Sequence, residues 1–326
     1  MTNAPPQATF LKDYSAPPYR IRHADVDFAL DATATRVRSV MQIVAQGAVP
    51  QDEKWQLENR APTRELYRGL TERVLGTRLI VWPEAAVPEL ANDVQDYLKQ
   101  VYAAGHEHGS DLLMGALRAD GDDYYNSILA LGDTVAFYDK RHLVPFAEYF
   151  PLQSIDLVRR SFGRARQFSP GDPRPPLPSI AGGAGVIVCN EAMFPEIAAQ
   201  AVVAGAELLV NPANDSWFGS LKYSLQALDI VRLRAVEQRR FVVRTSTAGP
   251  SAIIDPSGRI IAQSGTFTRE WLSGAVSPQR SLTPYARVGD LFAGASAVAA
   301  LGAFVHAAWG STRASETSDP RRADLV

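Results

Sequence analysis

Three residues of this chain belong to the types that a covalent acyl-transfer catalyst needs. Glu84, Lys140 and Cys189 each follow or end a stretch whose composition predicts a β-strand, and Cys189 is the only cysteine. In layered α/β folds, polar groups at strand ends are frequently the reactive ones. A carboxylate can take the thiol proton, the thiolate can attack a carbonyl carbon, and an ammonium group can stabilise the oxyanion while lowering the thiol pKa.

Each of these residues also has an ordinary structural interpretation. A lone cysteine is usually a small buried hydrophobe, a lysine after a strand is usually solvated, and a glutamate after Trp-Pro can cap a helix. The catalytic hypothesis therefore depends on the combination of these three residues and on the sequence motifs around them.

The composition is that of a folded protein with a large core. The chain has 326 residues, 46% of them hydrophobic, and a formal net charge of −2. This near-neutral balance gives no reason to expect nucleic acid as a partner. One cysteine excludes an internal disulfide, and with five histidines it makes a thiolate zinc site a poor hypothesis. No metal or organic cofactor is predicted.

Strands and helices alternate after an irregular, proline-containing lead-in, which we place at residues 1–40. Two hairpins are predicted, with turns at 132–133 and 255–258. The alternation predicts an α/β or α+β layered sandwich in a single domain, over 41–276. The strands are expected at 41–46, 79–82, 111–117, 184–189, 207–211 and 241–246, and the helices at 62–76, 89–109 and 195–204, with one more before the strand at 241.

The C-terminal region contains a long uncharged segment. Leu291–Trp309 has no Asp, Glu, Lys or Arg over nineteen residues, close to the ~20 that span a bilayer. We therefore predict a single transmembrane helix over 288–310 and a polar tail over 311–326. The arginines that follow would place the tail in the cytoplasm by the positive-inside rule. The alternative is an ordinary buried helix.

Four sequence motifs around the three candidate residues resemble those of a known family. They are "WPE" (82–84), "YDKRHLVPFAEYFP" (138–151), "CNEAMFPE" (189–196) and "NDSWFG" (214–219). They resemble the carbon–nitrogen hydrolase (nitrilase) superfamily, and more closely the extracytoplasmic domain of the apolipoprotein N-acyltransferase family. The similarity runs from about Met41 to Trp309. It implies an α+β fold, the nitrilase-like αββα sandwich, over residues 41–280.

The resemblance also implies roles for the residues at the matching positions. Glu84 matches the general base, Lys140 the oxyanion-stabilising lysine and Cys189 the nucleophile. Glu148, in "PFAEY", matches a second glutamate that helps to hold the site. The backbone N–H of Asn190 would complete the oxyanion hole.

Three further residues match positions that the family keeps near the lipid and the cysteine: Trp55, Trp217 and Glu191. We expect Glu191 to be a structural group, because residues two apart on a strand end do not easily share a proton. The chain departs from the family pattern at two places. Asn190 stands where an aromatic residue is usual, and "RTSTAG" (244–249) has threonine in place of the usual asparagine.

The implied reaction is transfer of an acyl chain from a phospholipid, through a thioester on the cysteine, to the N-terminal amine of a diacylglyceryl-cysteine lipoprotein. The partners would be the phospholipid, the lipoprotein and the bacterial inner membrane, with the catalytic domain on its extracytoplasmic side. The family carries a bundle of membrane helices ahead of this domain, so a separately encoded bundle or a longer parent chain is expected. Two alternatives remain: a soluble nitrilase-type amidase that hydrolyses a small carbon–nitrogen bond, and a non-catalytic remnant domain.

Overall fold

The computed structural model describes residues 37–44, 55–151, 168–217 and 221–317, and it does not describe the side chains of 37–44, 217 and 308–317. Nearly all of the predicted lead-in therefore lies outside the described residues.

The first sheet of the described part has seven strands in the order β12-β1-β2-β4-β5-β6, with β3 paired to β4. The pairing of β1 with β12 brings the two ends of the domain together. The strands are β1 (Val37–Val44), β2 (Leu79–Val81), β3 (Val87–Leu90), β4 (Asp111–Asp120), β5 (Asp123–Leu131), β6 (Val135–Asp139) and β12 (Arg269–Val276).

The second sheet has five strands in the order β11-β10-β9-β8-β7. Strands β7, β8 and β9 run parallel, as expected for strands joined by helical crossovers. The members are β7 (Ala184–Val186), β8 (Leu208–Ala213), β9 (Val242–Ser246), β10 (Ala252–Ile254) and β11 (Ile260–Gln263).

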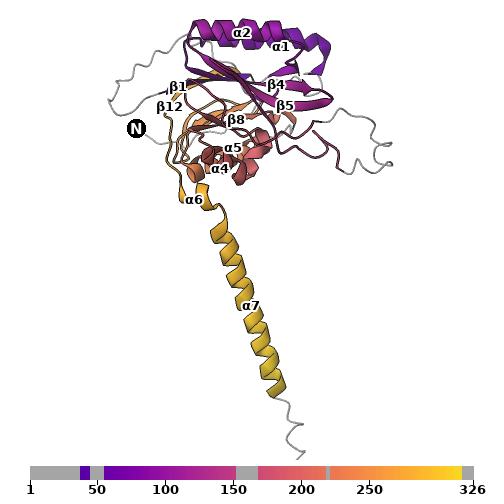
Figure 1. The fold of residues 1–326 in the computed structure, drawn as a ribbon, viewed down its shortest axis with the longest axis vertical. Coiled ribbons are helices and arrows are strands. Elements are labelled where there is room, and N and C mark those ends of the chain that lie inside the picture. Colours follow the sequence, from indigo (N-terminus) through magenta and orange to yellow (C-terminus); the bar gives the residue numbers. More distant parts are fainter. Residues whose placement is uncertain (1–36, 45–54, 152–167, 218–220, 318–326) are drawn as a thin grey trace, which may run out of the picture. The chain divides into compact units, whose positions relative to one another are not determined.

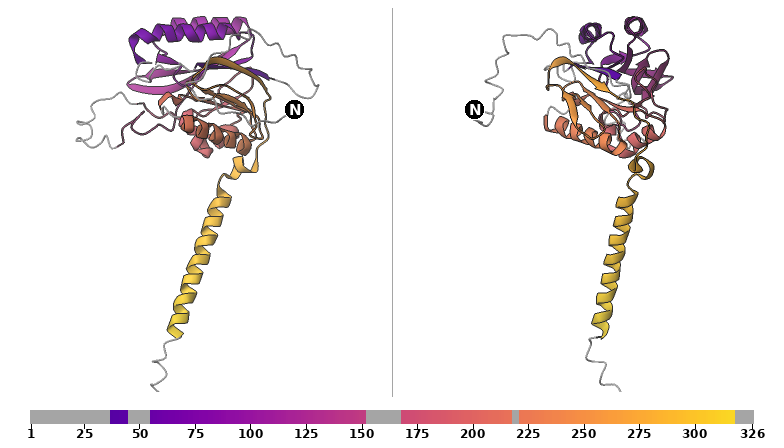
Figure 2. Two further views of the ribbon diagram at one scale, coloured as in Figure 1. Left: turned by 180° about the vertical axis from the view of Figure 1, so that it is seen from behind. Right: turned by 90° about the vertical axis from the view of Figure 1, so that its left-hand side faces the viewer.

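Helices cover the outer face of each sheet and complete four layers (Figure 1). The outer face of the first sheet packs against α1 (Leu57–Glu72) and α2 (Gln95–Glu107). The outer face of the second packs against α4 (Pro195–Val203) and α5 (Leu221–Gln238). Figure 2 shows the same order of helices, sheet, sheet and helices from two further sides. The predicted αββα sandwich is confirmed.

The layers are held by apolar side chains on both faces of the central strands. Leu79 and Val81 of β2 point between the two sheets, whereas Ile80 points toward α1 and α2, and all three are fully buried. Each such side chain contributes about 1.5–3 kcal/mol relative to an exposed one. This is why short runs of β-branched residues and leucine predicted strands correctly here.

Several element boundaries differ from the sequence predictions; the strand predicted over 184–189 ends at Val186, for example, and the helix predicted over 62–76 ends at Glu72. The first strand begins at Val37, inside the predicted lead-in, because β1 extends along β12. Helix α1 begins at Leu57, ahead of Pro62. Residues 87–90, where the predicted helix 89–109 was to begin, form the short strand β3 because they pair with β4.

Beyond the sandwich, α6 (Pro284–Val288) ends at Gly289, whose φ is +54°, and α7 runs from Leu291 to Thr317. Helix α7 is therefore continuous over Leu291–Trp309, as predicted, and extends into the predicted polar tail. Its described side chains, Leu291 to Ala307, are all exposed.

Among the described residues, no helix combines the length and the apolarity that crossing a membrane requires. The predicted transmembrane helix is thus not supported. The segment is rich in alanine and glycine, and these small side chains favour transfer into lipid much less than leucine or isoleucine.

Candidate active site

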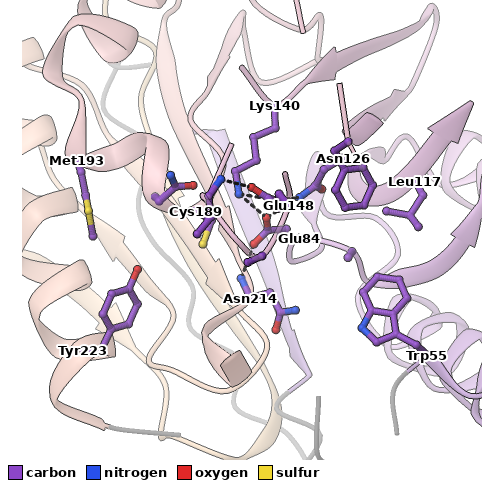
Figure 3. Close-up of a pocket in the computed structure, with 15 residues that line it drawn as sticks. Trp55, Glu84, Leu117, Asn126, Lys140, Glu148, Cys189, Met193, Asn214 and Tyr223 are labelled. Carbon is purple, nitrogen blue, oxygen red and sulfur yellow. Dashed lines mark hydrogen bonds and ion pairs between the residues drawn. The ribbon is translucent and has the colours of Figure 1, made fainter. Parts of the chain in front are cut away.

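The candidate catalytic residues meet because the strands that carry them end at one side of the sandwich. Strand β4 is parallel to β2, and two antiparallel steps through β5 bring β6 back to that direction. Glu84 and Lys140 therefore follow strand ends on the same side of the first sheet. Cys189 follows β7 of the second sheet. All three line one cavity of about 440 Å³ (Figure 3).

Lys140 lies between two glutamates. Its Nζ atom is 3.0 Å from Glu84 Oε1 and 2.9 Å from Glu148 Oε1, and its side chain is 1% exposed. Burial by itself lowers the pKa of Lys140, but the charges of Glu84, Cys189 and Glu148 together raise it above its ordinary value. The ammonium group therefore stays charged, which an oxyanion-stabilising group requires.

Asn126 joins the two glutamates from the opposite side. This residue of β5 donates from Nδ2 to Glu84 Oε1 at 2.7 Å and to Glu148 Oε1 at 2.9 Å. The other oxygen of Glu84 accepts the main-chain N–H of Asn214 at 2.8 Å, and the other oxygen of Glu148 accepts that of Val144 at 2.7 Å. Both carboxylates are therefore fixed by charge-assisted bonds. The sequence reasoning missed Asn126, although an asparagine inside an apolar strand was a signal.

Cys189 is the first residue of a short 3₁₀ helix, η3 (Cys189–Met193), and lies at the strained turn that follows β7. Its φ is +51°, a left-handed conformation that non-glycine residues rarely adopt, and such strain is concentrated at functional sites. The turn exposes the thiol to the cavity.

The Cys189 thiol is a weaker acid than the sequence suggested, because the nearby lysine was expected to lower its pKa. Burial, followed by the charge of Glu84, raises the pKa of Cys189 well above its ordinary value. Lys140 and the main-chain N–H of Asn214 act in the opposite direction, as a cation and a donor should, but they are outweighed. The resting residue is therefore a thiol, and a base is needed to remove its proton.

Glu191 is fully buried behind this turn. Its Oε2 accepts the hydroxyl of Tyr138 at 3.0 Å and the N–H of Val188 at 2.7 Å. Its Oε1 accepts the N–H groups of Arg141 at 2.6 Å and His142 at 3.1 Å. Because Glu191 bonds the residue before Cys189 and the two residues after Lys140, it ties together the loops that carry these two candidate residues.

Two glycines let main chain approach the candidate residues closely. A Cβ atom on Gly115 would lie 2.2 Å from the carbonyl oxygen of Pro83 and 2.8 Å from Glu84 Cα. One on Gly171 would lie 2.3 Å from the carbonyl oxygen of Asp139, the residue before Lys140. Only glycine fits at these contacts, so the positions of both loops depend on it.

The other predicted site residues are two tryptophans and an asparagine. Trp55 and Asn190 line the cavity, and Asn190 Nδ2 is 3.3 Å from the carbonyl oxygen of His142. The side chain of Trp217 lies outside the described residues. Most of the other lining groups are apolar, including Leu117 and Met193. The cavity therefore offers an apolar wall facing a charged one.

Tyr223 is a lining residue that the sequence reasoning missed. It comes from α5 and lies on the Cys189 side of the cavity (Figure 3). Burial, with the charges of Cys189 and Asp215, raises its pKa to about 12, so the phenol keeps its proton near neutral pH. Tyr223 belongs to no recognisable motif, and a single tyrosine in a helix gives no sequence signal of a functional site.

The strand ends behind the cysteine are tied by a buried ion pair. Arg244 Nη2 is 2.7 Å from Asp215 Oδ2, both side chains being 1% exposed, and Arg244 Nη1 also bonds Asn211 Oδ1. Thr247, the threonine of "RTSTAG", donates to the side-chain oxygen of Asn214. This departure from the family pattern therefore contacts Asn214, which precedes Asp215 in the chain and donates its main-chain N–H to Glu84.

The arrangement contains a thiol, two carboxylates and a cation at one largely apolar cavity. Such a set can deprotonate a thiol and stabilise an oxyanion without a metal ion. Within the described residues, no group of His, Cys, Asp and Glu side chains is arranged to hold a metal.

The four-layer fold is shared with proteins of the nitrilase class. The C. elegans NitFhit protein superposes with a TM-score of 0.58 at 18% identity, over 75% of this chain and 61% of that one. Nit3 of Saccharomyces cerevisiae, a nitrilase superfamily member, gives 0.56 at 20% identity over 74% and 90%. An amidase from Nesterenkonia sp. AN1 gives 0.55 at 18% over 75% and 92%. At these identities the likeness concerns the fold.

The chain belongs to the carbon–nitrogen hydrolase family, whose model matches residues 43–283. Its relatives include the apolipoprotein N-acyltransferase of Methylococcus capsulatus, 37% identical over 254 residues that cover 75% of this chain and 50% of that protein. The enzyme of the same name from Azotobacter vinelandii is 38% identical over 256 residues, covering 74% and 48%. The chain thus spans about half the length of the curated relatives it matches.

Proposed function

We propose that this chain acts as an N-acyltransferase that moves an acyl group from a phospholipid to the N-terminal amine of a diacylglyceryl-cysteine lipoprotein. The observation that carries the proposal is the meeting of Glu84, Lys140 and Cys189 at one largely apolar cavity. The names of the relatives supply the class of substrate.

In the first half-reaction, Glu84 takes the proton of the Cys189 thiol and the sulfur attacks the ester carbonyl carbon. Because the raised pKa keeps Cys189 protonated at rest, the base has to remove this proton before or during the attack. Lys140 and the main-chain N–H of Asn190 face the oxyanion. The carbon–oxygen bond then breaks, the leaving alkoxide takes the proton from Glu84, and a lysophospholipid departs from a thioester.

In the second half-reaction, the lipoprotein amine attacks the thioester carbon and gives a proton to Glu84. The carbon–sulfur bond breaks, and the thiolate of Cys189 recovers a proton from Glu84. The apolar wall of the cavity would cover the acyl chain and limit the access of water, which would otherwise hydrolyse the thioester. Glu148 would keep the ammonium group of Lys140 in place, and Trp55 and Trp217 would contact lipid.

These substrates meet at the extracytoplasmic side of the bacterial inner membrane, which we therefore propose as the site of action. A bundle of membrane helices, encoded separately or on a longer parent chain, is a further proposed partner.

Amide hydrolysis is the second candidate, because the fold is shared with an amidase. The two reactions use the same thioester and differ in whether water or an amine opens it. A non-catalytic domain would form no thioester.

The deciding experiment is intact-protein mass spectrometry after incubation with phospholipid vesicles. The expected result is a mass increase of one acyl group, absent in Cys189→Ala, released by neutral hydroxylamine, and chased by a diacylglyceryl-cysteine peptide into N-acyl peptide. An acyl adduct that decays equally with and without the peptide would favour hydrolysis. No adduct from phospholipid or from small amides would reject both enzymes.

A further inference from the structure

A small chamber adjoins the catalytic cavity at Cys189. The linings of the two share Cys189, Met193 and Tyr223, which lie on the same side of the catalytic cavity (Figure 3). The chamber is bounded by residues of α5, β9, η3 and a second 3₁₀ helix, η4 (Asp215–Trp217). Its volume is about 10 Å³, which is close to the smallest volume that accommodates one water molecule. A water inside it would therefore contact several lining groups at once.

Half of the residues that line the chamber have side chains that can form hydrogen bonds. These are Cys189, Asp215, Tyr223 and Arg244, while Ala192, Met193, Ala227 and Ile230 supply apolar surface. The charges of Cys189 and Asp215 raise the pKa of the Tyr223 phenol, and that of Arg244 lowers it. The hydroxyl therefore lies near all three groups, as the shared lining also indicates.

The guanidinium of Arg244 has one donor that its protein contacts do not use. Nη2 bonds Asp215 and Nη1 bonds Asn211, but no residue that the structure describes accepts the N–H of the buried Nε atom. The side chain is 1% exposed, so bulk solvent does not reach this group. Buried donors are nearly always paired, and ordered water is the usual partner where protein offers none. A water in the chamber would be that partner.

We propose that the chamber holds one ordered water that accepts the Nε–H of Arg244 and donates a hydrogen bond to the sulfur of Cys189 once the thiol has lost its proton. The lining provides a full set of partners for this water. Arg244 and the Tyr223 hydroxyl donate to its oxygen, and the Asp215 carboxylate and the sulfur accept its two hydrogens. A water that accepts from a cation is polarised and becomes a stronger donor.

Arg244 and Tyr223 are then positioning residues, which act on the nucleophile through the water. Their effect applies twice in the cycle, when the thiolate forms for the first attack and when it leaves the thioester in the second half-reaction. A fixed donor at a developing negative charge lowers both barriers. The inference rests on the proposed function only in taking Cys189 as the nucleophile, and the two tests below need no acyl transfer.

The first test is a crystal structure of the full chain at a resolution that shows ordered water. We expect one water peak in the chamber at about 3 Å from Arg244 Nε, the ordinary length of such a hydrogen bond. In Ala227→Val the added methyl groups point into the space that the water needs, and the peak should disappear. A chamber of the unchanged protein without a water peak would overturn the proposal.

The second test measures thiolate formation directly, as the rate at which iodoacetamide alkylates Cys189 at a fixed pH near neutral. Ala227→Val and Tyr223→Phe should each lower this rate about tenfold, the contribution of roughly one hydrogen bond. The reason is that a thiolate without its donor is less stable, so a smaller fraction of the thiol is ionised. Phenylalanine is smaller than tyrosine, so a slower reaction of Tyr223→Phe cannot come from an obstructed thiol.

Ala199→Val in α4 and Tyr102→Phe in α2 are the matched controls. They make the same changes at half-buried positions that line neither the chamber nor the catalytic cavity, so alkylation should keep its rate. Unchanged rates in Ala227→Val and Tyr223→Phe would overturn the role of the water even if the crystal structure contained it. Slower alkylation of these two variants in a protein that phospholipid does not acylate would support the water site while rejecting the proposed acyl transfer.

Discussion

The two sheets hold their parts of the candidate active site in different ways. Glu84, Lys140 and Glu148, on loops of the first sheet, are held mainly by one another through buried ion pairs. Cys189, on the second sheet, is held by a strained turn, and Glu191 fixes that turn through main-chain N–H groups. The first arrangement depends on charge balance and the second on backbone geometry. Substitutions on the two sides should therefore fail in different ways.

The substitution with the largest expected effect is Glu84→Gln. It tests two properties of Glu84: its role as a base and the effect of its charge on the thiol pKa. In Glu84→Gln, acyl-enzyme formation should fall by about 10²–10⁴, the usual contribution of general-base catalysis. The thiol pKa should also fall, because the charge of Glu84 raises it. Iodoacetamide should therefore alkylate Cys189 faster near neutral pH, and the midpoint of the alkylation–pH profile should move down.

Glu148→Gln is the control for this experiment, since the side-chain charges that shift the thiol pKa most are those of Glu84, Lys140 and Asp215. The midpoint of its alkylation–pH profile should move less than that of Glu84→Gln. A Glu84→Gln protein that loses acylation and alkylation together would show that the thiol depends on Glu84 for geometry, and the contrast between the two sheets would weaken.

A second prediction tests the charge balance on the first sheet. Lys140→Met should lower the free energy of unfolding by about 3–5 kcal/mol, because it leaves buried carboxylates without their cation. Urea titration measures the change. Lys99→Met, at a side chain that is 72% exposed, should alter stability little. A loss below about 1 kcal/mol at Lys140, the range of surface pairs, would mean that Asn126 and main-chain donors suffice.

A third prediction asks whether geometry matters on the first sheet as well. Gly115→Ala puts a methyl group against Pro83 and should displace Glu84. Misplacement of a reacting group by about 1 Å can reduce a rate about 10²-fold. The rate of acyl-enzyme formation is the measurement. Gly69→Ala, in α1 where nothing lies within 4 Å of the added atom, should leave it unchanged.

The smallest expected effect concerns the second sheet. In Glu191→Gln an amide NH₂ must face N–H or O–H donors that a carboxylate oxygen accepted. This should lower the free energy of unfolding by about 1–3 kcal/mol, less than for Lys140. Glu196→Gln, at an exposed position of α4, is the control. A loss as large as that of Lys140→Met would mean that charge balance governs both sheets alike.

The fold was predictable where local patterns decide it. Strand β2, the hairpins at 132–133 and 255–258, and helix α4 were placed from apolar runs and turn residues, because short-range chemistry specifies them. Strand β3 and the start of α1 were not, since pairing with β4 and packing on the sheet set those boundaries. The apolarity of α7 was overestimated from the lack of charge alone.

The sequence by itself determined which residues have reactive side chains and which family motifs surround them. It therefore placed Glu84, Lys140, Glu148 and Cys189 as candidates, although it could not test their roles. Only the tertiary structure decided what surrounds each group: Asn126 between two glutamates, Tyr223 beside the thiol, and a thiol pKa that is raised despite the nearby lysine. These outcomes depend on burial and on distances between residues far apart in the chain, and a sequence carries neither quantity directly.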